Sequence, residues 1–552
     1  MKKGLLIVTM VALMMTACSE KEALTSNETP IYDLSNVEVS DVGYISITDF
    51  YAKMVQKATE SNSDQKQILL DYAQTQLVRA REMEQFLNDS LNNVHGTNGE
   101  AYGENWDHPN GGGKNRLLWF QYCTLRYKAK GALGRDEELS ELVVWPYGNA
   151  WDPQPDNVIV GCHCTVLSNP ERPTNFDDFD VQTDLFMFAS FAHSLSQEAL
   201  IVIPDYEGYG STHGNTHPYI DREILAQQVV EGTKAAIAWY NNKFKEGIKE
   251  GWKSVALGYS QGGNVAASVL RYVQEHGETS LHMVGAVCGG GCYSPLETLK
   301  SYINSGRIYM PIATALMLKS CVDTQSDLAG LRIEDLCTEE FIETGIFDWI
   351  QEKKLITEDI QFNLLAHSAV KGGFLMYCYD KELEEFLPFD SIEYRRKHDW
   401  NLDYGTAGSY CTPDAVFLPD VIDFFTRGTI TNEGMPERKA YLQKLKALNQ
   451  VLERNSLCYG WTPWAGAGFT FFHSTRDEVV PYCNVEFVDS KKRWDIGHPL
   501  PYRLIDYENA STYLHVATGT AFFIDYCAQY VDDLLNGNWQ GGRKDEYGGK
   551  YY

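Results

Sequence analysis

The stretch Gly258-Tyr259-Ser260-Gln261-Gly262 constrains the fold more than any other part of this sequence. An apolar run at 254–257 precedes it, and residues 263–270, which have helical spacing, follow it. This order predicts a strand, a tight turn and a helix, and the glycines on both sides of the serine allow a turn sharp enough to expose its hydroxyl. Ser260 is therefore a candidate nucleophile, provided that the chain supplies an acid and a histidine further on.

Segments with strand and helix patterns alternate around this stretch. Such alternation is typical of a mostly parallel sheet with helices on both faces, so we expect functional groups beyond the carboxyl ends of the strands. The predicted strands are 117–129, 142–146, 157–163, 199–204, 254–257, 283–288 and 468–473, and a helix is predicted at 224–248.

The segment between the predicted strands 283–288 and 468–473 is far longer than a connecting loop and must hold structure of its own. Much of it has helical spacing. Residues 436–454, for example, place apolar side chains on one face behind a proline. We interpret this insertion as a cap over the active site, where such insertions shape the substrate pocket and act as lids.

The part of the chain before the sheet has a different pattern. Residues 47–59 and 64–93 are amphipathic and predict two helices, and a linker at 95–114, rich in glycine and asparagine, separates them from the sheet. The sequence thus predicts a signal peptide (1–17), a tether (18–35), an N-terminal helical extension (36–114), the first part of an α/β core (115–298), a mainly helical cap (299–460) and the second part of the core (461–552).

Asp477 lies in the turn directly after the predicted strand 468–473. A serine hydrolase built on a parallel sheet keeps its acid at such a strand end, so Asp477 is the candidate acid and Glu478 is its nearest rival. The alternative interpretation is a solvated loop acid or a helix N-cap before Val479.

His498 and His515 both lie downstream of the acid and are candidates for the base. A helix and a strand should intervene between acid and histidine, and residues 485–491 and 502–507 are the available segments. His498 comes before the second segment, whereas His515 comes after it. We therefore choose His515, against the alternative of a capping or core histidine next to a predicted helix at 521–535.

The chain order Ser260, Asp477, His515 is that of the α/β-hydrolases. The chain also carries the short motifs Asp205-Tyr206-Glu207-Gly208, His217-Pro218-Tyr219, residues 258–263 and Gly460-Trp461-Thr462-Pro463. With these motifs in this order, the chain resembles the secretory lipase family of the α/β-hydrolases from about Tyr122 to Tyr530. The resemblance implies an α/β-hydrolase fold, a helical lid between serine and acid, and hydrolysis of carboxylic esters.

One motif departs from the family pattern. Related enzymes often carry His-Gly-Thr after the third strand, where this chain has His163-Cys164-Thr165. A cysteine in place of that glycine affects how closely the backbone approaches the substrate. We expect the oxyanion of the reaction to be held by the N–H of Gln261 and by one N–H of this loop, from Cys164 or Thr165.

These residues predict a serine hydrolase that cleaves small-molecule or lipid esters through an acyl-enzyme. Ser260 would be the nucleophile, His515 the general base and acid, and Asp477 the residue that holds the histidine tautomer. This chemistry needs no metal and no organic cofactor. The alternatives are a serine peptidase on the same fold and a binding lipoprotein that no longer catalyses. A fluorophosphonate probe distinguishes an active serine from a non-catalytic one.

The net charge of −28 argues against a nucleic-acid partner, because such binding needs a basic surface. Cys288 and Cys292, and likewise Cys321 and Cys337, are near enough in sequence to suggest disulfides outside the cytoplasm. Cys162-His163-Cys164 has metal-binding residue types, but alternate positions on a strand and no second ligand pair favour buried cysteines. No sequence feature indicates an oligomeric state.

The first residues have the parts of a bacterial export signal. Lys2 and Lys3 precede an apolar run at 5–15 that is too short to span a bilayer, and Ala17 precedes Cys18. A cysteine directly after the small residue looks like a bacterial lipobox, which implies cleavage before Cys18 and acylation of that residue. We expect an exported protein that contacts the bacterial membrane only through this lipid, at the periplasmic or surface face of the outer membrane.

Replacing the lipidation site, Cys18→Ala, is expected to release the protein from the membrane, because only the acylated cysteine would hold it there. Cell fractionation checks this: the wild type should pellet with membranes, and the variant should stay in the soluble fraction. Equal solubility of both proteins would favour an ordinary signal peptide with an incidental cysteine.

Overall fold

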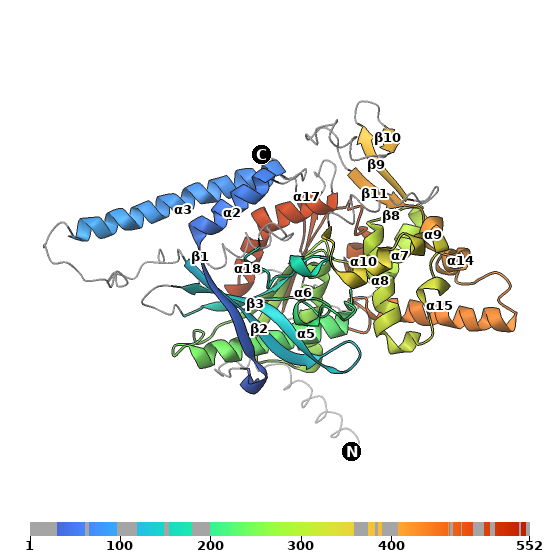
Figure 1. Cartoon of the computed structure of the whole chain (residues 1–552), viewed down its shortest axis with the longest axis horizontal. Helices are drawn as coiled ribbons and strands as arrows, with labels where there is room; N and C mark the ends of the chain where they lie inside the picture. Colours follow the sequence, from blue (N-terminus) through green and yellow to red (C-terminus); the bar gives the residue numbers. More distant parts are fainter. Residues whose placement is uncertain are drawn as a thin grey trace, which may run out of the picture.

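A ten-stranded sheet forms the centre of the part of the chain that the computed structural model describes (Figure 1). From one edge to the other its order is β1-β2-β3-β5-β4-β6-β7-β12-β13-β14. The strands are β1 (Glu38–Ser46), β2 (Trp119–Lys130), β3 (Asp136–Tyr147), β4 (Asn157–Cys162), β5 (Ala199–Pro204), β6 (Ser254–Tyr259), β7 (Met283–Gly289), β12 (Gly468–His473), β13 (Tyr502–Tyr507) and β14 (Arg543–Tyr547).

The described residues are 30–60, 66–95, 119–147, 154–178, 199–357, 374–380, 385–388, 407–461, 463, 467–475, 477–489, 502–507, 514–539 and 543–547. The predicted lipidation site Cys18 and the alternative base His498 lie outside them. Among the described helices, none is both long and apolar enough to cross a bilayer.

The sheet is mostly parallel, as predicted. All neighbours from β5 to β14 run parallel, whereas β1, β2, β3 and β5 pair antiparallel with one another in turn. The chain leaves β4 toward β5 on one side and leaves β6 toward β7 on the other. The carboxyl ends of β4 and β6 therefore meet where the direction of winding reverses, which is where open α/β sheets place their ligands.

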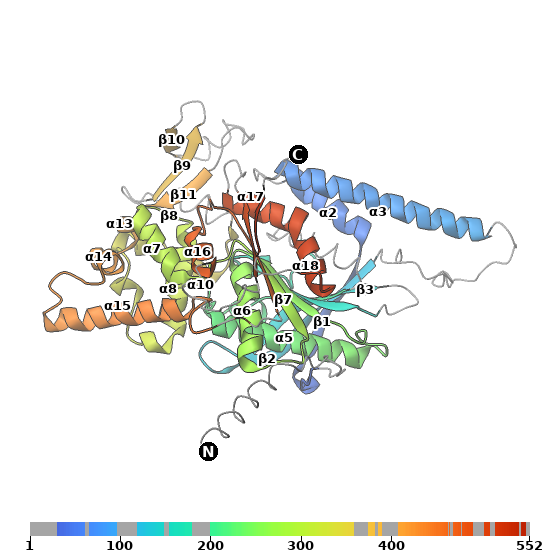
Figure 2. The ribbon, with the colours of Figure 1, turned by 180° about the vertical axis from the view of Figure 1, so that it is seen from behind.

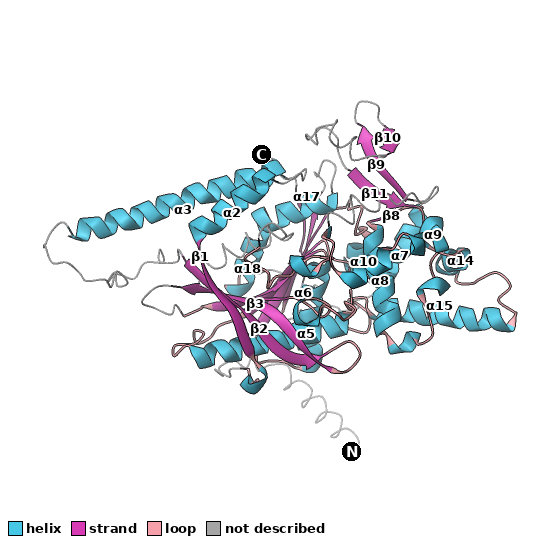
Figure 3. Ribbon diagram, viewed as in Figure 1, coloured by secondary structure: helices cyan, strands magenta, loops and turns pink. Residues whose placement is uncertain are grey.

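Both faces of the sheet are covered by helices, and each face has its own hydrophobic core (Figure 3). In β5, Leu200 and Val202 join one core while Ile201 and Ile203 join the other, because successive side chains of a strand point to opposite faces. One core contains α5 (Arg222–Lys243) and α6 (Gln261–His276), and the other contains α2 (Ile47–Glu60), α3 (Lys66–His95), a π-helix (Phe522–Tyr526) and α18 (Cys527–Leu535). The π-helix continues α17 (Leu514–Ala521) directly.

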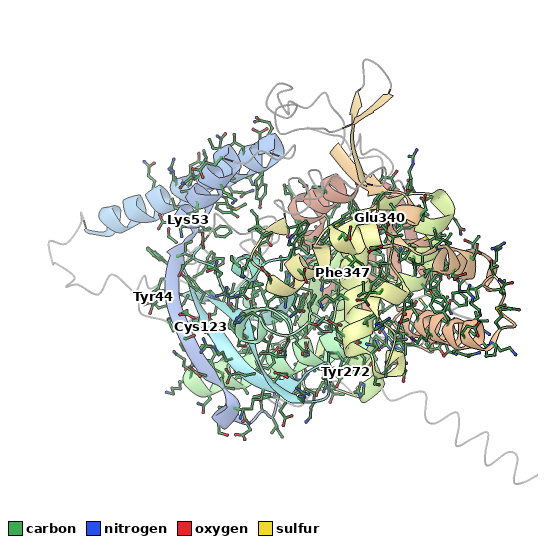
Figure 4. All side chains as sticks on the ribbon, turned by 45° about the vertical axis from the view of Figure 1, so that its right-hand side comes forward. Tyr44, Lys53, Cys123, Tyr272, Glu340 and Phe347 are labelled. Carbon is green, nitrogen blue, oxygen red and sulfur yellow. The ribbon has the colours of Figure 1, made fainter. Side chains whose placement is uncertain are left out.

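The N-terminal extension is not purely helical, contrary to the prediction. Its helices α2 and α3 start and end close to the predicted residues, but β1 precedes them and pairs antiparallel with β2 at the edge of the sheet. β1 has a bulge between Ser40 and Gly43 and few buried side chains, so it lacks the alternating apolar pattern that predicts a strand. In Figure 4 the exposed Tyr44 marks this edge strand.

The insertion between β7 and β12 forms its own hydrophobic core and lies on the opposite side of the molecule from α2 and α3 (Figures 1 and 2). In Figure 4, Glu340 and Phe347 mark it. Its helices are α7 (Pro295–Ser305), α8 (Pro311–Thr324), α9 (Glu339–Glu343), α10 (Ile346–Glu352), α13 (Pro413–Val416), α14 (Pro419–Arg427) and α15 (Pro436–Arg454), and α16 (Cys483–Asp489) follows β12.

The insertion also contains a small sheet that the sequence did not predict. Its described strands follow the order β10-β9-β11-β8, and all its pairings are antiparallel. Short apolar runs such as that of β9 fit a helix as well as a strand, because periodicity alone does not separate the two. The strands are β8 (Ile308–Tyr309), β9 (Phe374–Asp380), β10 (Glu385–Pro388) and β11 (Ala407–Cys411).

The cysteine pairs suggested from sequence proximity are not disulfides. Cys288, Cys292, Cys321 and Cys337 are all thiols. Cys288 is buried in β7, while the Cys292 thiol lies 3.3 Å from the hydroxyl of Thr298.

Candidate active site

The turn at Ser260 connects β6 to α6 as predicted. Ser260 itself has φ 57° and ψ −122°, a conformation that is costly for a residue with a side chain and that recurs at functional sites. The flanking glycines are needed for close packing: a Cβ on Gly262 would lie 2.0 Å from the carbonyl oxygen of Cys162, and one on Gly258 would lie 2.4 Å from the Gly262 backbone. The N–H of Ser260 donates to the carbonyl of Gly289 at 2.9 Å.

The predicted serine, histidine and acid lie in one hydrogen-bonded chain. His515 Nε2 is 2.9 Å from the hydroxyl of Ser260, and His515 Nδ1 is 2.7 Å from Asp477 Oδ2. Asp477 follows β12 and is buried, and His515 lies in the first turn of α17. The elements that bring these side chains together are therefore the ends of β6 and β12 and the start of α17.

The surroundings of His515 favour one arrangement of its protons. An ionised Asp477 only accepts hydrogen bonds, so Nδ1 carries the proton and Nε2 is free to take a proton from Ser260. The other oxygen of Asp477 accepts from the N–H groups of Val479 and Val480, at 3.0 and 2.7 Å, which fixes the carboxylate. The hydroxyl of Tyr259 donates to the His515 carbonyl at 2.6 Å and fixes the backbone.

Charges near His515 outweigh the effect of its burial. Burial by itself lowers the pKa of His515, but Asp477, which accepts its hydrogen bond, and Glu478 raise that pKa above its usual value. A higher pKa makes the imidazole a stronger base toward the serine proton.

Glu478, the rival acid, contacts the backbone of His515. Its Oε2 accepts from the N–H of His515 at 3.2 Å. Burial, reinforced by the charge of Asp477, raises the pKa of Glu478 to about 7. Geometry therefore favours Asp477 as the partner of the imidazole, and it places a second carboxyl group where its charge acts on the same histidine.

The three candidates for the oxyanion site occupy two neighbouring segments. Gln261 is the first residue of α6, so its N–H has no acceptor within the helix. Cys164 and Thr165 follow β4, whose last residue pairs with Gly258 in β6. The loop packs directly on the turn, because a Cβ on Gly262 would also lie 2.9 Å from the His163 carbonyl oxygen.

A mostly apolar cavity opens at Ser260. Of the three oxyanion candidates, Gln261 lines the cavity, whereas Cys164 and Thr165 are not among its described lining residues. Thr165 is nevertheless close, because its hydroxyl lies 2.9 Å from the hydroxyl of Tyr219, a lining residue. Most of the cavity wall comes from the insertion and the adjoining loops; the sequence predicted an insertion over the site but not which of its residues line the cavity. The lining residues are Tyr219, Ile220, Ser260, Gln261, Cys292, Thr298, Leu299, Tyr302, Met310, Ala313, Thr314, Met317, Val479 and Val480.

The described residues contain no group of three or more His, Cys, Asp or Glu side chains that could hold a metal ion. In the Cys162-His163-Cys164 segment, His163 stacks on Tyr206 with ring centroids 4.1 Å apart, and Cys162 is buried in the sheet core.

The model of the secretory lipase family matches residues 171–329, in agreement with the resemblance noted from the motifs. Among curated proteins, no sequence matches. The fold is similar to that of the rice cell wall degrading esterase LipA from Xanthomonas oryzae, with a TM-score of 0.54 and 17% identity over 76% of this chain and 92% of that one.

A putative hydrolase from Legionella pneumophila has a TM-score of 0.52 and 17% identity over 77% of this chain and 93% of that chain. Both structures cover this chain far beyond the 171–329 segment. The chain therefore has the α/β-hydrolase fold, with a sequence similar to the secretory lipases over residues 171–329.

Proposed function

We propose that this chain is a lipase- or esterase-type serine hydrolase that cleaves carboxylic esters through an acyl-enzyme. The observation that carries the proposal is the hydrogen-bonded chain from Asp477 through His515 to Ser260 at the edge of a mostly apolar cavity. The match to the secretory lipase family and the fold shared with a cell wall degrading esterase support it.

In the first step the hydroxyl of Ser260 attacks the ester carbonyl while His515 Nε2 takes its proton. When the tetrahedral intermediate collapses, the alcohol leaves with that proton from His515, and the acyl group stays on Ser260. Water then attacks the acyl-enzyme, with His515 again as base, and releases the acid. Asp477 holds the imidazole in the required tautomer throughout.

The negative oxygen of each tetrahedral intermediate needs preorganised donors. The N–H of Gln261 is one, because it directly follows the nucleophile and has no helical acceptor. An N–H of Cys164 or Thr165 is the second in this proposal, since their loop packs against the same turn.

The cavity favours an ester with an apolar acyl group over a peptide. On α8, Ala313 and Thr314 lie four and three residues before Met317, so the three present one side of the helix to the cavity, and Met310, directly before the helix, lines it as well. Apolar side chains of this kind bury a hydrocarbon chain and offer few partners for a peptide backbone. In this proposal the predicted cap, 299–460, supplies the acyl site, and the exported, lipid-anchored location remains as predicted from the N-terminus.

Substitution of the proposed base tests the function. His515→Ala is expected to lower kcat for p-nitrophenyl esters by several orders of magnitude, as on removal of a triad member, and Ser260→Ala should do the same. His498→Ala is the matched control and should leave kcat nearly unchanged. Fluorophosphonate labelling should be lost in Ser260→Ala. Reversal of the ranking of the two histidines, or amidase activity without esterase activity, would contradict the proposal.

The charge of Glu478 should be visible in the pH dependence of kcat/KM. The reaction needs neutral His515, so kcat/KM falls as the pH drops through the pKa of that residue. Because Glu478 raises this pKa, Glu478→Gln is expected to shift the acidic limb to lower pH while keeping an acceptor for the backbone N–H of His515.

A pH series of kcat/KM for the wild type and Glu478→Gln measures the shift. Glu486→Gln, an exposed acid on α16, is the control and should leave the limb in place. A limb that stays in place or moves to higher pH in Glu478→Gln would show that its charge does not act on the base.

Filling the cavity should change acyl-length preference. Ala313→Phe adds a ring on the cavity side of α8, so it should reduce kcat/KM for p-nitrophenyl octanoate strongly while p-nitrophenyl acetate is hydrolysed nearly as before. Each excluded methylene costs about 0.8 kcal/mol of binding, and about 1.4 kcal/mol corresponds to a tenfold change, so loss of two methylene contacts predicts a change of roughly tenfold.

The matched control is Ala440→Phe, which places the same ring on an exposed position of α15 and should change neither ester. An equal loss for all acyl lengths in Ala313→Phe, with folding intact by circular dichroism, would mean that the cavity does not hold the acyl chain.

A further inference from the structure

We propose that His217 is a positioning residue of the oxyanion site: by binding the side-chain amide of Gln261, it keeps the adjacent Gln261 N–H directed at the reacting carbonyl. The inference rests on the proposed function. His217 belongs to the His217-Pro218-Tyr219 motif, for which neither the sequence nor the triad provides a role.

The hydrogen bonds of His217 define its proton arrangement. His217 Nδ1 is 2.8 Å from the carbonyl oxygen of Glu207, and His217 Nε2 is 2.6 Å from Gln261 Nε2. A carbonyl oxygen only accepts, so Nδ1 carries the proton and Nε2 accepts from the Gln261 amide. The ring is buried, and burial lowers the pKa of His217 to about 3, which keeps the imidazole neutral and this direction of donation intact.

A hydrogen bond to the side chain of Gln261 acts on the backbone directly beside the nucleophile. It directly follows Ser260, whose φ of 57° lies in an unfavourable region, and it starts α6. Its side chain is buried and lines the cavity beside the nucleophile. Fixing the amide group at the end of the Gln261 side chain restricts rotation of Gln261 as a whole. The direction of its backbone N–H, which has no helical acceptor, is restricted with it.

Aromatic rings hold His217 in place. The centroids of the Tyr206, Tyr209 and Tyr219 rings lie 5.9, 5.1 and 5.9 Å from that of His217, and Tyr206 is stacked on it. The imidazole therefore has little freedom to follow the Gln261 amide if that side chain moves.

The same rings reach the second candidate donor segment. Tyr206 also stacks on His163, with centroids 4.1 Å apart, and the hydroxyl of Tyr219 is 2.9 Å from that of Thr165. His217 thus lies between the loop after β4 and the first residue of α6. It sets the spacing of the two segments that the proposed mechanism requires to converge on one oxygen atom.

Substitution tests this role in the full-length enzyme. His217→Leu removes the acceptor at similar size, so kcat for p-nitrophenyl butyrate should fall about 10- to 100-fold, less than the roughly 100- to 1000-fold loss on deleting an oxyanion donor. KM should change little, because the group acts on the transition state. Affinity for a trifluoromethyl ketone, which forms a tetrahedral adduct with the serine, should fall in proportion to kcat.

A double-mutant cycle shows whether His217 acts through Gln261. Gln261→Leu should lower kcat as His217→Leu does, and the double variant should be no slower than either single variant. His217→Gln, which offers both an acceptor and a donor, should restore part of kcat. The control is His213→Leu, the same substitution at an exposed histidine of the same loop, which should leave kcat unchanged.

The outcomes separate this proposal from the proposed function. Wild-type kcat in His217→Leu, a change confined to KM, or additive losses in the cycle would overturn the positioning role while Ser260-dependent esterase activity persists. Absence of that activity from the wild type would instead refute the proposed function. If His217→Leu does not fold, the kcat and the ketone affinity of Gln261→Leu and His217→Gln test the same positioning role.

Discussion

The close contact between Gly262 and the end of β4 is the constraint on which the rest of the site depends. No side chain fits between Gly262 and the carbonyl oxygen of Cys162, so the first turn of α6 lies directly against the neighbouring strand. This contact positions Ser260 above the sheet, brings the loop after β4 beside the N–H of Gln261 and leaves the cavity on the side of the insertion. The first turn of α6 can come this close to the end of β4 because the strand order of the parallel sheet reverses between β4 and β6.

The sequence predicted the parts of the fold whose signals are local. β5, β12 and β13 have the predicted bounds, since short apolar runs between turns are typical of buried strands. Asp477 and His515 were identified as a pair because they follow the ends of such strands. The edge strand β1 and the small sheet of the insertion were not predicted, because pairing at an edge or in short strands leaves little periodic pattern. The cap over the site was predicted, but the residues that line the cavity were not, since they depend on how α7 and α8 pack over the sheet.

Asp205 and Glu207, two motif residues that do not line the cavity, stabilise the loops around the site through buried polar contacts. Asp205, at the end of β5, accepts from the hydroxyls of Ser140 and Thr174 at 2.6 and 2.7 Å, and so joins β3 to the loop before β5. Glu207 accepts from the side chain of Gln228 on α5 at 2.7 Å. Buried polar groups are costly without partners, so each of these contacts specifies one arrangement of the loops around His217. The family resemblance therefore extends to the support of the site as well as to its proposed nucleophile.

The insertion separates Ser260 from Asp477 and His515 along the chain, yet β7 and β12, the strands at its two ends, pair directly with each other. The N–H of Gly290 donates to the carbonyl of Phe472 across this junction at 2.8 Å. Closing so long a loop costs conformational entropy, and such non-local contacts slow folding. Asp477 and His515 approach Ser260 only when the two ends of the insertion have met. During synthesis Ser260 is present before Asp477 and His515, so the base in the proposed mechanism would become available only once β12 and α17 have joined the central sheet.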